Sequence, residues 1–236
     1  MNTSQPIYMS PKVVLNRINN IVTRCPHGLD NITRREHKED REYLPVALLL
    51  MALKELDGRL RWLQSGEYIV MDSDVAVITQ RGMDQEGLPI LDSTIEHCQV
   101  TEFEGHSKTF IEVVKGKLKP GYDGRGANLV VNVREHPEWT FFPHELANDV
   151  SRLSPTYDSI WLICESENKT FNFHVIRLWP ELFHTQFDAL TSFDEDWFPD
   201  FVRASPKFIT KIEAGLGEYQ MELPICKKCA SHRMRN

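Results

Sequence analysis

Apolar residues near the N-terminus are spaced as in amphipathic helices. Ser10-Pro11 supplies a cap and a first-turn proline, so a helix is predicted to begin there. A second helix is predicted from Thr33, where a capping-box sequence starts, and Pro45 is expected to kink or restart it. After this proline the apolar positions narrow to one stripe: Leu49, Leu53, Leu56, Leu60 and Leu63.

The middle of the chain has the short apolar runs of strands. Strands are predicted within residues 68–78 and 90–103, and two buried strands at 127–133 and 159–164. Helices are predicted at 109–118 and 143–153, and a strand at 171–178 is expected to be an edge hairpin partner. Strand, helix and strand in succession indicate a right-handed crossover. The predicted fold is α/β, with a mixed central sheet flanked by helices.

Composition narrows the class of protein without naming a function. The 236 residues include 27 Lys and Arg against 34 Asp and Glu, a net charge of −7, so binding to nucleic acid or to an anionic membrane by bulk charge is excluded. Five cysteines over this length favour reduced thiols, and no apolar run approaches the roughly 20 residues of a membrane span. We therefore expect a cytoplasmic protein that does not bind membranes.

The C-terminal region differs in character from the rest of the chain. We divide the sequence into an N-terminal helix (1–32), an α/β core (33–179) and a helical or irregular appendage with a basic tail (180–236). Aromatic residues lie among acids around Trp197. Either this segment docks a protein partner, as exposed aromatic residues beside acids would suit, or its aromatics cover one side of the core.

The basic tail contains a candidate zinc site. Cys226 and Cys229 are spaced so that both thiolates could bind one ion from a tight turn, and His232 would be a third ligand. A structural zinc site needs four ligands, and no second Cys-x-x-Cys is present. The competing interpretation is a basic tail with incidental cysteines.

Carboxylates at the predicted strands form a second constellation. Asp74 belongs to a polar break in one strand, Glu96 lies on the next, and Glu42 belongs to the second helix. Mg²⁺ or Mn²⁺ prefers such oxygen ligands, and ions held in this way activate water for phosphodiester hydrolysis.

The order of a helix, a strand with Asp, a strand with Glu, a crossover helix and a further strand resembles the restriction-endonuclease-like fold of the PD-(D/E)XK nuclease superfamily. The resemblance covers about residues 33–178. It implies that Asp74 and Glu96 hold the metal with help from Glu42. The lysine expected two residues after Glu96 is absent, so Gln99 or Lys117 would position the nucleophile. A second register pairs Asp92 with Glu112 and Lys115.

Two functions follow from this resemblance. In the first, the chain is a Mg²⁺-dependent nuclease, and local basic residues hold the substrate: Arg34, Arg35, Lys38, Lys115, Lys117, Lys119 and Arg125. In the second, the chain is a catalytically inactive nuclease-like fold that acts as a protein- or nucleic-acid-binding module. The net charge is compatible with both functions. Five acids lie at residues 188–200, and the rest of the chain has 29 acidic against 27 basic residues.

Overall fold

A computed structural model describes residues 7–24, 38–65, 74–85, 87–105, 108–118, 126–133, 140–166, 171–189, 197, 200–205 and 208–214. Four helices lie in this part of the chain: α1 (Pro11–Arg24), α2 (Lys38–Asp57), α3 (Phe110–Lys117) and α4 (Pro143–Ser151). The strands are β1 (Ile7–Met9), β2 (Arg61–Ser65), β3 (Val75–Met83), β4 (Pro89–Phe103), β5 (Ala127–Val133), β6 (Ser159–Glu165), β7 (Asn172–Trp179), β8 (Phe183–Asp188), β9 (Phe201–Ser205) and β10 (Phe208–Ala214).

All ten described strands belong to one mixed sheet, in the order β10-β9-β1-β2-β3-β4-β5-β6-β7-β8. Strands β4, β5 and β6 are parallel, and every other neighbouring pair is antiparallel. The β5-α4-β6 passage is thus the expected crossover. Strand β10 also contacts β4, so this half of the sheet curls back toward its middle.

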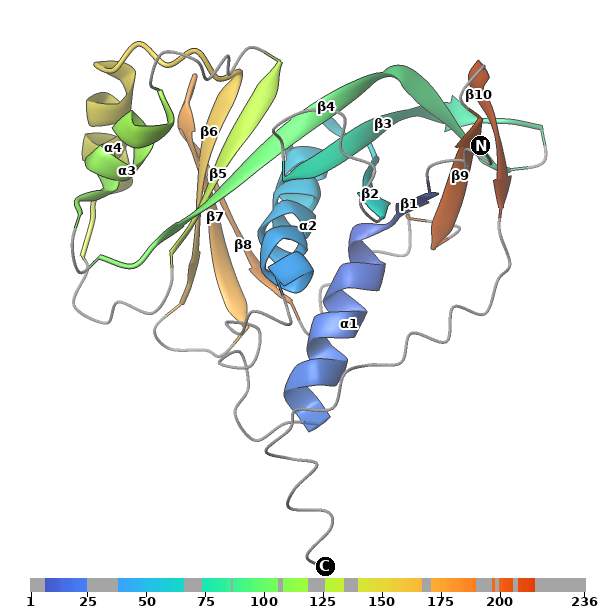
Figure 1. The fold of residues 1–236 in the computed structure, drawn as a ribbon, viewed down its shortest axis with the longest axis horizontal. Coiled ribbons are helices and arrows are strands. Elements are labelled where there is room, and N and C mark those ends of the chain that lie inside the picture. The colour runs from blue at the N-terminus through green and yellow to red at the C-terminus, as the bar shows by residue number, and fades with distance from the viewer. Residues whose placement is uncertain are drawn as a thin grey trace, which may run out of the picture.

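Helices cover both faces of the sheet, as predicted. Figure 1 shows α3 and α4 beside β5–β7 on one side, with α1 and α2 on the other. The α1/α2 side has a core that contains Leu49, Trp62 and Trp161, each 0% exposed. The α3/α4 side has a separate core around Leu129 and Leu162. Residues of the two cores alternate along β5 and β6 because successive side chains point to opposite faces.

Local sequence signals explain several element ends. Helix α1 starts at Pro11, as the Ser10-Pro11 pair predicts. Thr109 and Glu112 form a reciprocal capping box at the start of α3. Helix α2 runs through Pro45 without restarting, and it ends at Asp57, where Gly58 takes a positive φ of 72° that suits glycine.

Two parts of the predicted architecture need correction. The apolar stripe of α2 stops before Leu60, because the turn at Gly58 sends residues 61–65 into β2. The region after residue 180 is not only helical or irregular. It contributes β8, β9 and β10 to the main sheet, so 172–179 is not an edge strand: β8 lies outside it. The sheet also takes β1 from the N-terminal segment.

Candidate functional site

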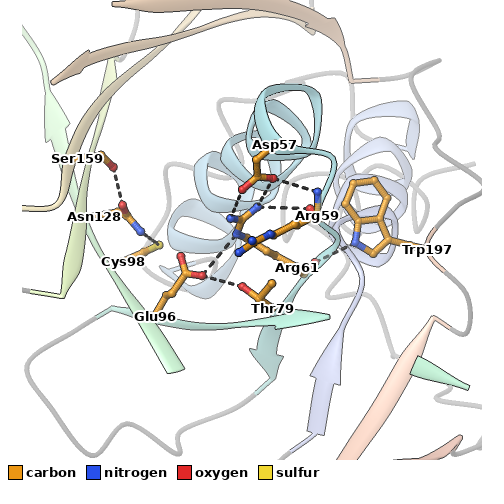
Figure 2. Close-up of polar contacts among 9 residues, drawn as sticks. All are labelled: Asp57, Arg59, Arg61, Thr79, Glu96, Cys98, Asn128, Ser159 and Trp197. Carbon is orange, nitrogen blue, oxygen red and sulfur yellow. Dashed lines mark hydrogen bonds and ion pairs between the residues drawn. The ribbon is translucent and has the colours of Figure 1, made fainter. Parts of the chain in front are cut away.

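An ion-pair network joins the end of α2 to three strands on the α1/α2 face of the sheet (Figure 2). The guanidinium of Arg61 binds Asp57 through two parallel bonds, Nη1 to Oδ1 at 3.0 Å and Nη2 to Oδ2 at 2.6 Å. Its Nε lies 3.5 Å from Oε1 of Glu96. The same Glu96 oxygen accepts a 2.7 Å hydrogen bond from the hydroxyl of Thr79. One buried cation is therefore held between two carboxylates.

Strand register creates this arrangement. Arg61 follows Asp57 by four positions in sequence. The turn at Gly58 between them places Arg61 at the start of β2. Arg61 pairs with Thr79 across β2 and β3, and Val77 pairs with Glu96 across β3 and β4. Arg61, Thr79 and Glu96 consequently share one face of three neighbouring strands.

The network shifts the ionisation of its members. Burial alone would raise the pKa of Asp57, but the hydrogen bonds from Arg61 and from the Arg59 amide outweigh it, so the pKa is lowered. Burial alone would lower the pKa of Arg61, yet Asp57 and Glu96 raise it. Asp57 and Arg61 thus stabilise each other in their charged forms.

A polar row continues from the network across the three parallel strands. Cys98, Asn128 and Ser159 are direct register partners on β4, β5 and β6. The Asn128 amide nitrogen lies 4.0 Å from the Cys98 sulfur, and the Ser159 hydroxyl donates to Asn128 at 2.5 Å. Burial, with the charge of Glu96, raises the pKa of the Cys98 thiol to about 12. Cys98 is therefore a neutral, unreactive thiol at neutral pH.

Asp74 lies apart from the Arg61 network and binds backbone. Its carboxylate accepts a 2.7 Å hydrogen bond from the Val100 amide, and its own amide donates to the Cys98 carbonyl at 3.1 Å. These two bonds hold the start of β3 against β4. Asp74 thus has a structural role in the geometry observed.

Gln99 and Lys117 lie on the other side of the sheet from Glu96. Gln99 is 5% exposed and accepts a hydrogen bond from the hydroxyl of Tyr157. The same hydroxyl is 3.3 Å from the backbone carbonyl of Lys117, at the end of α3. Three positions along one strand separate Glu96 from Gln99, so their side chains point to opposite faces. The structure does not bring these predicted site residues together.

The remaining predicted residues are scattered. Glu42 is partly buried in α2, and Lys115 is exposed near the end of α3. Asp92 lies on β4, and Glu112 is engaged in the α3 cap. The side chains of the other predicted substrate-binding residues, and the candidate zinc ligands, lie outside the described residues: Arg34, Arg35, Lys38, Lys119, Arg125, Cys226, Cys229 and His232.

The carboxylates predicted to bind magnesium are engaged in other contacts in the described structure. Across the described ranges, no group of three or more His, Cys, Asp or Glu is placed to hold a metal ion. Glu96 is already paired with Arg61, and Asp74 already accepts a backbone hydrogen bond. The Mg²⁺ or Mn²⁺ site remains a sequence-based prediction that this geometry does not support.

Trp197 packs inside the protein. It is 2% exposed, and its indole Nε1 donates a 2.8 Å hydrogen bond to the backbone carbonyl of Arg61. The Lys54 ammonium lies 5.2 Å from its ring centroid. The hypothesis that Trp197 is an exposed docking residue is therefore wrong, and the alternative, that it covers the core, is confirmed for this residue.

Sequence reasoning missed Arg61 and Asp57, although one signal was present. An acid and a base four residues apart, across the glycine that ends a helix, can pair after the chain turns. Glu96 could not be added to them from sequence, since its place depends on strand register.

No described helix is both long and apolar enough to cross a membrane. No family model, curated protein or solved structure matches the chain.

Proposed function

We propose that this chain is a protein-binding module built on a restriction-endonuclease-like core that does not hydrolyse phosphodiesters. One observation carries the proposal. The carboxylate that would hold a catalytic metal, Glu96, instead neutralises the guanidinium of Arg61. The positive charge beside Glu96 is therefore supplied by an arginine of the chain, in the place where a nuclease would hold a metal ion.

The order of elements supports the nuclease-like core. Helix α2 leads into the antiparallel strands β2, β3 and β4, and α3 then connects β4 to the parallel strand β5. Apart from the additional strand β2, this order is similar to the order of a helix, two strands with acids, a helix and a strand that suggested the resemblance. Asp74 precedes β3 and Glu96 lies on β4, as the resemblance implies for the two acids.

Charge argues against catalysis at that position. A divalent cation bound to Glu96 would lie within a few ångströms of the Arg61 guanidinium. At the effective dielectric of a partly buried site, like charges at such distances repel by several kcal/mol. Displacing the Arg61 side chain to admit a metal ion would also break its two bonds to Asp57.

A protein partner fits the described surface better than nucleic acid does. Phe142, next to the first residue of α4, is 66% exposed, the most exposed large apolar side chain in the described ranges. The exposed Lys115 on α3 shares its short helix with the acid Glu112. The net charge of −7 supplies no long-range attraction for phosphate. An exposed aromatic residue beside a helix end is a suitable anchor for a protein interface.

Metal-dependent hydrolysis is the competing proposal, and cleavage assays separate the two. Supercoiled plasmid and a single-stranded RNA would be incubated with the full chain and with Mg²⁺, Mn²⁺ or EDTA. We expect no metal-dependent cleavage above the level of an Asp74→Ala/Glu96→Ala double variant prepared in parallel. Cleavage by the wild-type chain that requires metal and is lost in that variant would establish the nuclease instead.

Binding experiments test the partner class. Anisotropy of labelled duplex DNA and single-stranded RNA should show no binding at physiological salt. Affinity capture should retain a protein that binds the wild-type chain but not Phe142→Ala, with Glu145→Ala, an exposed neighbour on α4, as the control. Salt-sensitive binding of DNA or RNA, with no protein lost on Phe142→Ala, would assign a nucleic-acid-binding module.

A further inference from the structure

Two histidines face each other across β7 and β8, far from the Arg61 network. His174 pairs with Gln186 in the strand register, and Ile176 pairs with His184, so the two histidines are diagonal neighbours. Ile176 belongs to the core on the α3/α4 side, which places both imidazoles on that face. His174 is partly buried and His184 is exposed. The pair is thus open to solvent on one side.

The ring nitrogens point at one another. Nδ1 of His174 lies 3.0 Å from Nε2 of His184, and the ring centroids are 5.2 Å apart with a 34° tilt between the rings. Only one hydrogen can lie between these nitrogens, so at least one of them presents a lone pair. Two imidazole nitrogens bound to one tetrahedral Zn²⁺ are about 3.3 Å apart, given Zn–N bonds of about 2.0–2.1 Å. A small ring movement would convert the observed contact into a chelate.

The strand pair holds both imidazoles in position for one ion, with Nδ1 of His174 and Nε2 of His184 facing each other. Neutral imidazole is the form that ligates transition metals. Two histidines held on adjacent antiparallel strands also lose little freedom when they bind one ion, because the sheet fixes both backbones.

The site is open rather than complete. Cys164 is the direct register partner of His174 on β6, and it is only partly exposed. No third His, Cys, Asp or Glu among the described residues is placed to complete a metal site. Water, or a carboxylate from a bound molecule, would occupy the other coordination positions.

We propose that His174 and His184 form a two-histidine site for a divalent transition-metal ion of the Zn²⁺ class. Imidazole suits Zn²⁺, Cu²⁺ and Ni²⁺, whereas Mg²⁺ and Ca²⁺ prefer oxygen ligands. The site is therefore distinct in both place and metal class from the carboxylate constellation on β3 and β4. It is independent of the proposed binding function.

The test uses Zn²⁺ alone and the full chain carrying Cys226→Ser and Cys229→Ser, so that the tail cysteines cannot contribute. Isothermal titration calorimetry should show one Zn²⁺ bound per chain. Because each histidine is one of two protein ligands, His174→Asn or His184→Asn should weaken binding by about tenfold or more. His97→Asn, on β4 three strands away from β7, should bind as the parent does.

A second measurement locates the ion directly. Zn²⁺ should slow the modification of His174 and His184 by diethyl pyrocarbonate, as read by peptide mass spectrometry, and leave the other described histidines unaffected. This readout does not depend on whether a variant folds. Absence of Zn²⁺ binding in the Cys226→Ser/Cys229→Ser chain would overturn the proposal. So would Zn²⁺ binding that leaves both histidines as reactive as they are without Zn²⁺.

Discussion

The guanidinium of Arg61 lies 3.5 Å from the carboxylate of Glu96, although the two residues are 35 positions apart in sequence. Arg61 also makes paired hydrogen bonds to Asp57, and its side chain is only 8% exposed. Figure 2 shows the cation held between the two acids, with Trp197 bonded to the Arg61 backbone on the other side. This contact fastens the end of α2 to β2 and β4. It also occupies the carboxylate that a catalytic metal would need.

Arg61→Ala should destabilise the fold, because it leaves two partly buried carboxylates without their cation. A fully buried pair loses about 3–5 kcal/mol when one partner is removed, and the partial exposure of Asp57 and Glu96 reduces our expectation to about 2 kcal/mol. Urea unfolding would measure the free energy. Arg59→Ala, an exposed arginine two residues away, is the matched control and should change it by less than about 0.5 kcal/mol. Equal changes in the free energy of unfolding in the two variants would contradict a stabilising role of the Arg61 ion pairs.

Acid should weaken the protein through Asp57. Its pKa in the folded state lies below the ordinary value of 3.8, so the ionised form stabilises the fold at neutral pH, and this contribution is lost as the pH falls through the folded-state pKa. The difference in unfolding free energy between wild type and Asp57→Asn should therefore shrink from pH 7 to pH 3. Asp149→Asn removes an exposed ion pair with Arg152 and should show little difference at either pH. A wild-type advantage over Asp57→Asn that stays constant down to pH 3 would contradict the lowered pKa.

Much of the fold could be predicted from local signals. The apolar run at 127–133 coincides with β5, and the crossover from β5 through α4 to β6 is parallel as expected. The strand β2 was missed because Leu60 and Leu63 continue the helical spacing of α2. Only the backbone turn at Gly58 separates them from that helix. Local spacing thus predicts elements well until one residue redirects the chain.

The candidate site was harder to predict, for a physical reason. Glu96 and Gln99 are three residues apart, so a sequence pattern groups them, but strand geometry sends them to opposite faces. The pairing of Arg61 with Glu96 depends on the register of β2, β3 and β4, and the β3–β4 pairing contains register shifts. Such shifts leave no signature that a single sequence shows. The same dependence on register hid the contact between His174 and His184.

Trp197→Ala should unfold the protein more readily, because Trp197 is almost wholly buried and bonded to β2. Truncation of a buried Trp costs about 3–5 kcal/mol, whereas truncation of an exposed aromatic residue changes stability by about 0.5 kcal/mol or less. Phe142→Ala is the matched truncation of an exposed aromatic residue, since Phe142 is 66% exposed. Thermal and urea unfolding of both variants would test this contrast. A Trp197→Ala chain as stable as wild type would mean that the indole does not pack against the core.

Cys98 and Cys164 should resist alkylation in the folded protein. Burial raises the pKa of each thiol to about 12, with the Glu96 charge contributing at Cys98. At pH 8 only about one thiol in ten thousand would then be the reactive thiolate. Iodoacetamide labelling at pH 8, followed by peptide mass spectrometry, should find both sites slow in buffer and fast in urea, where the ordinary pKa returns. Glu96→Gln should lower the pKa of Cys98 by removing a nearby negative charge, yet burial, the larger cause, should keep its labelling slow. Labelling of either cysteine in buffer at the rate seen in urea would show that its strand opens to solvent.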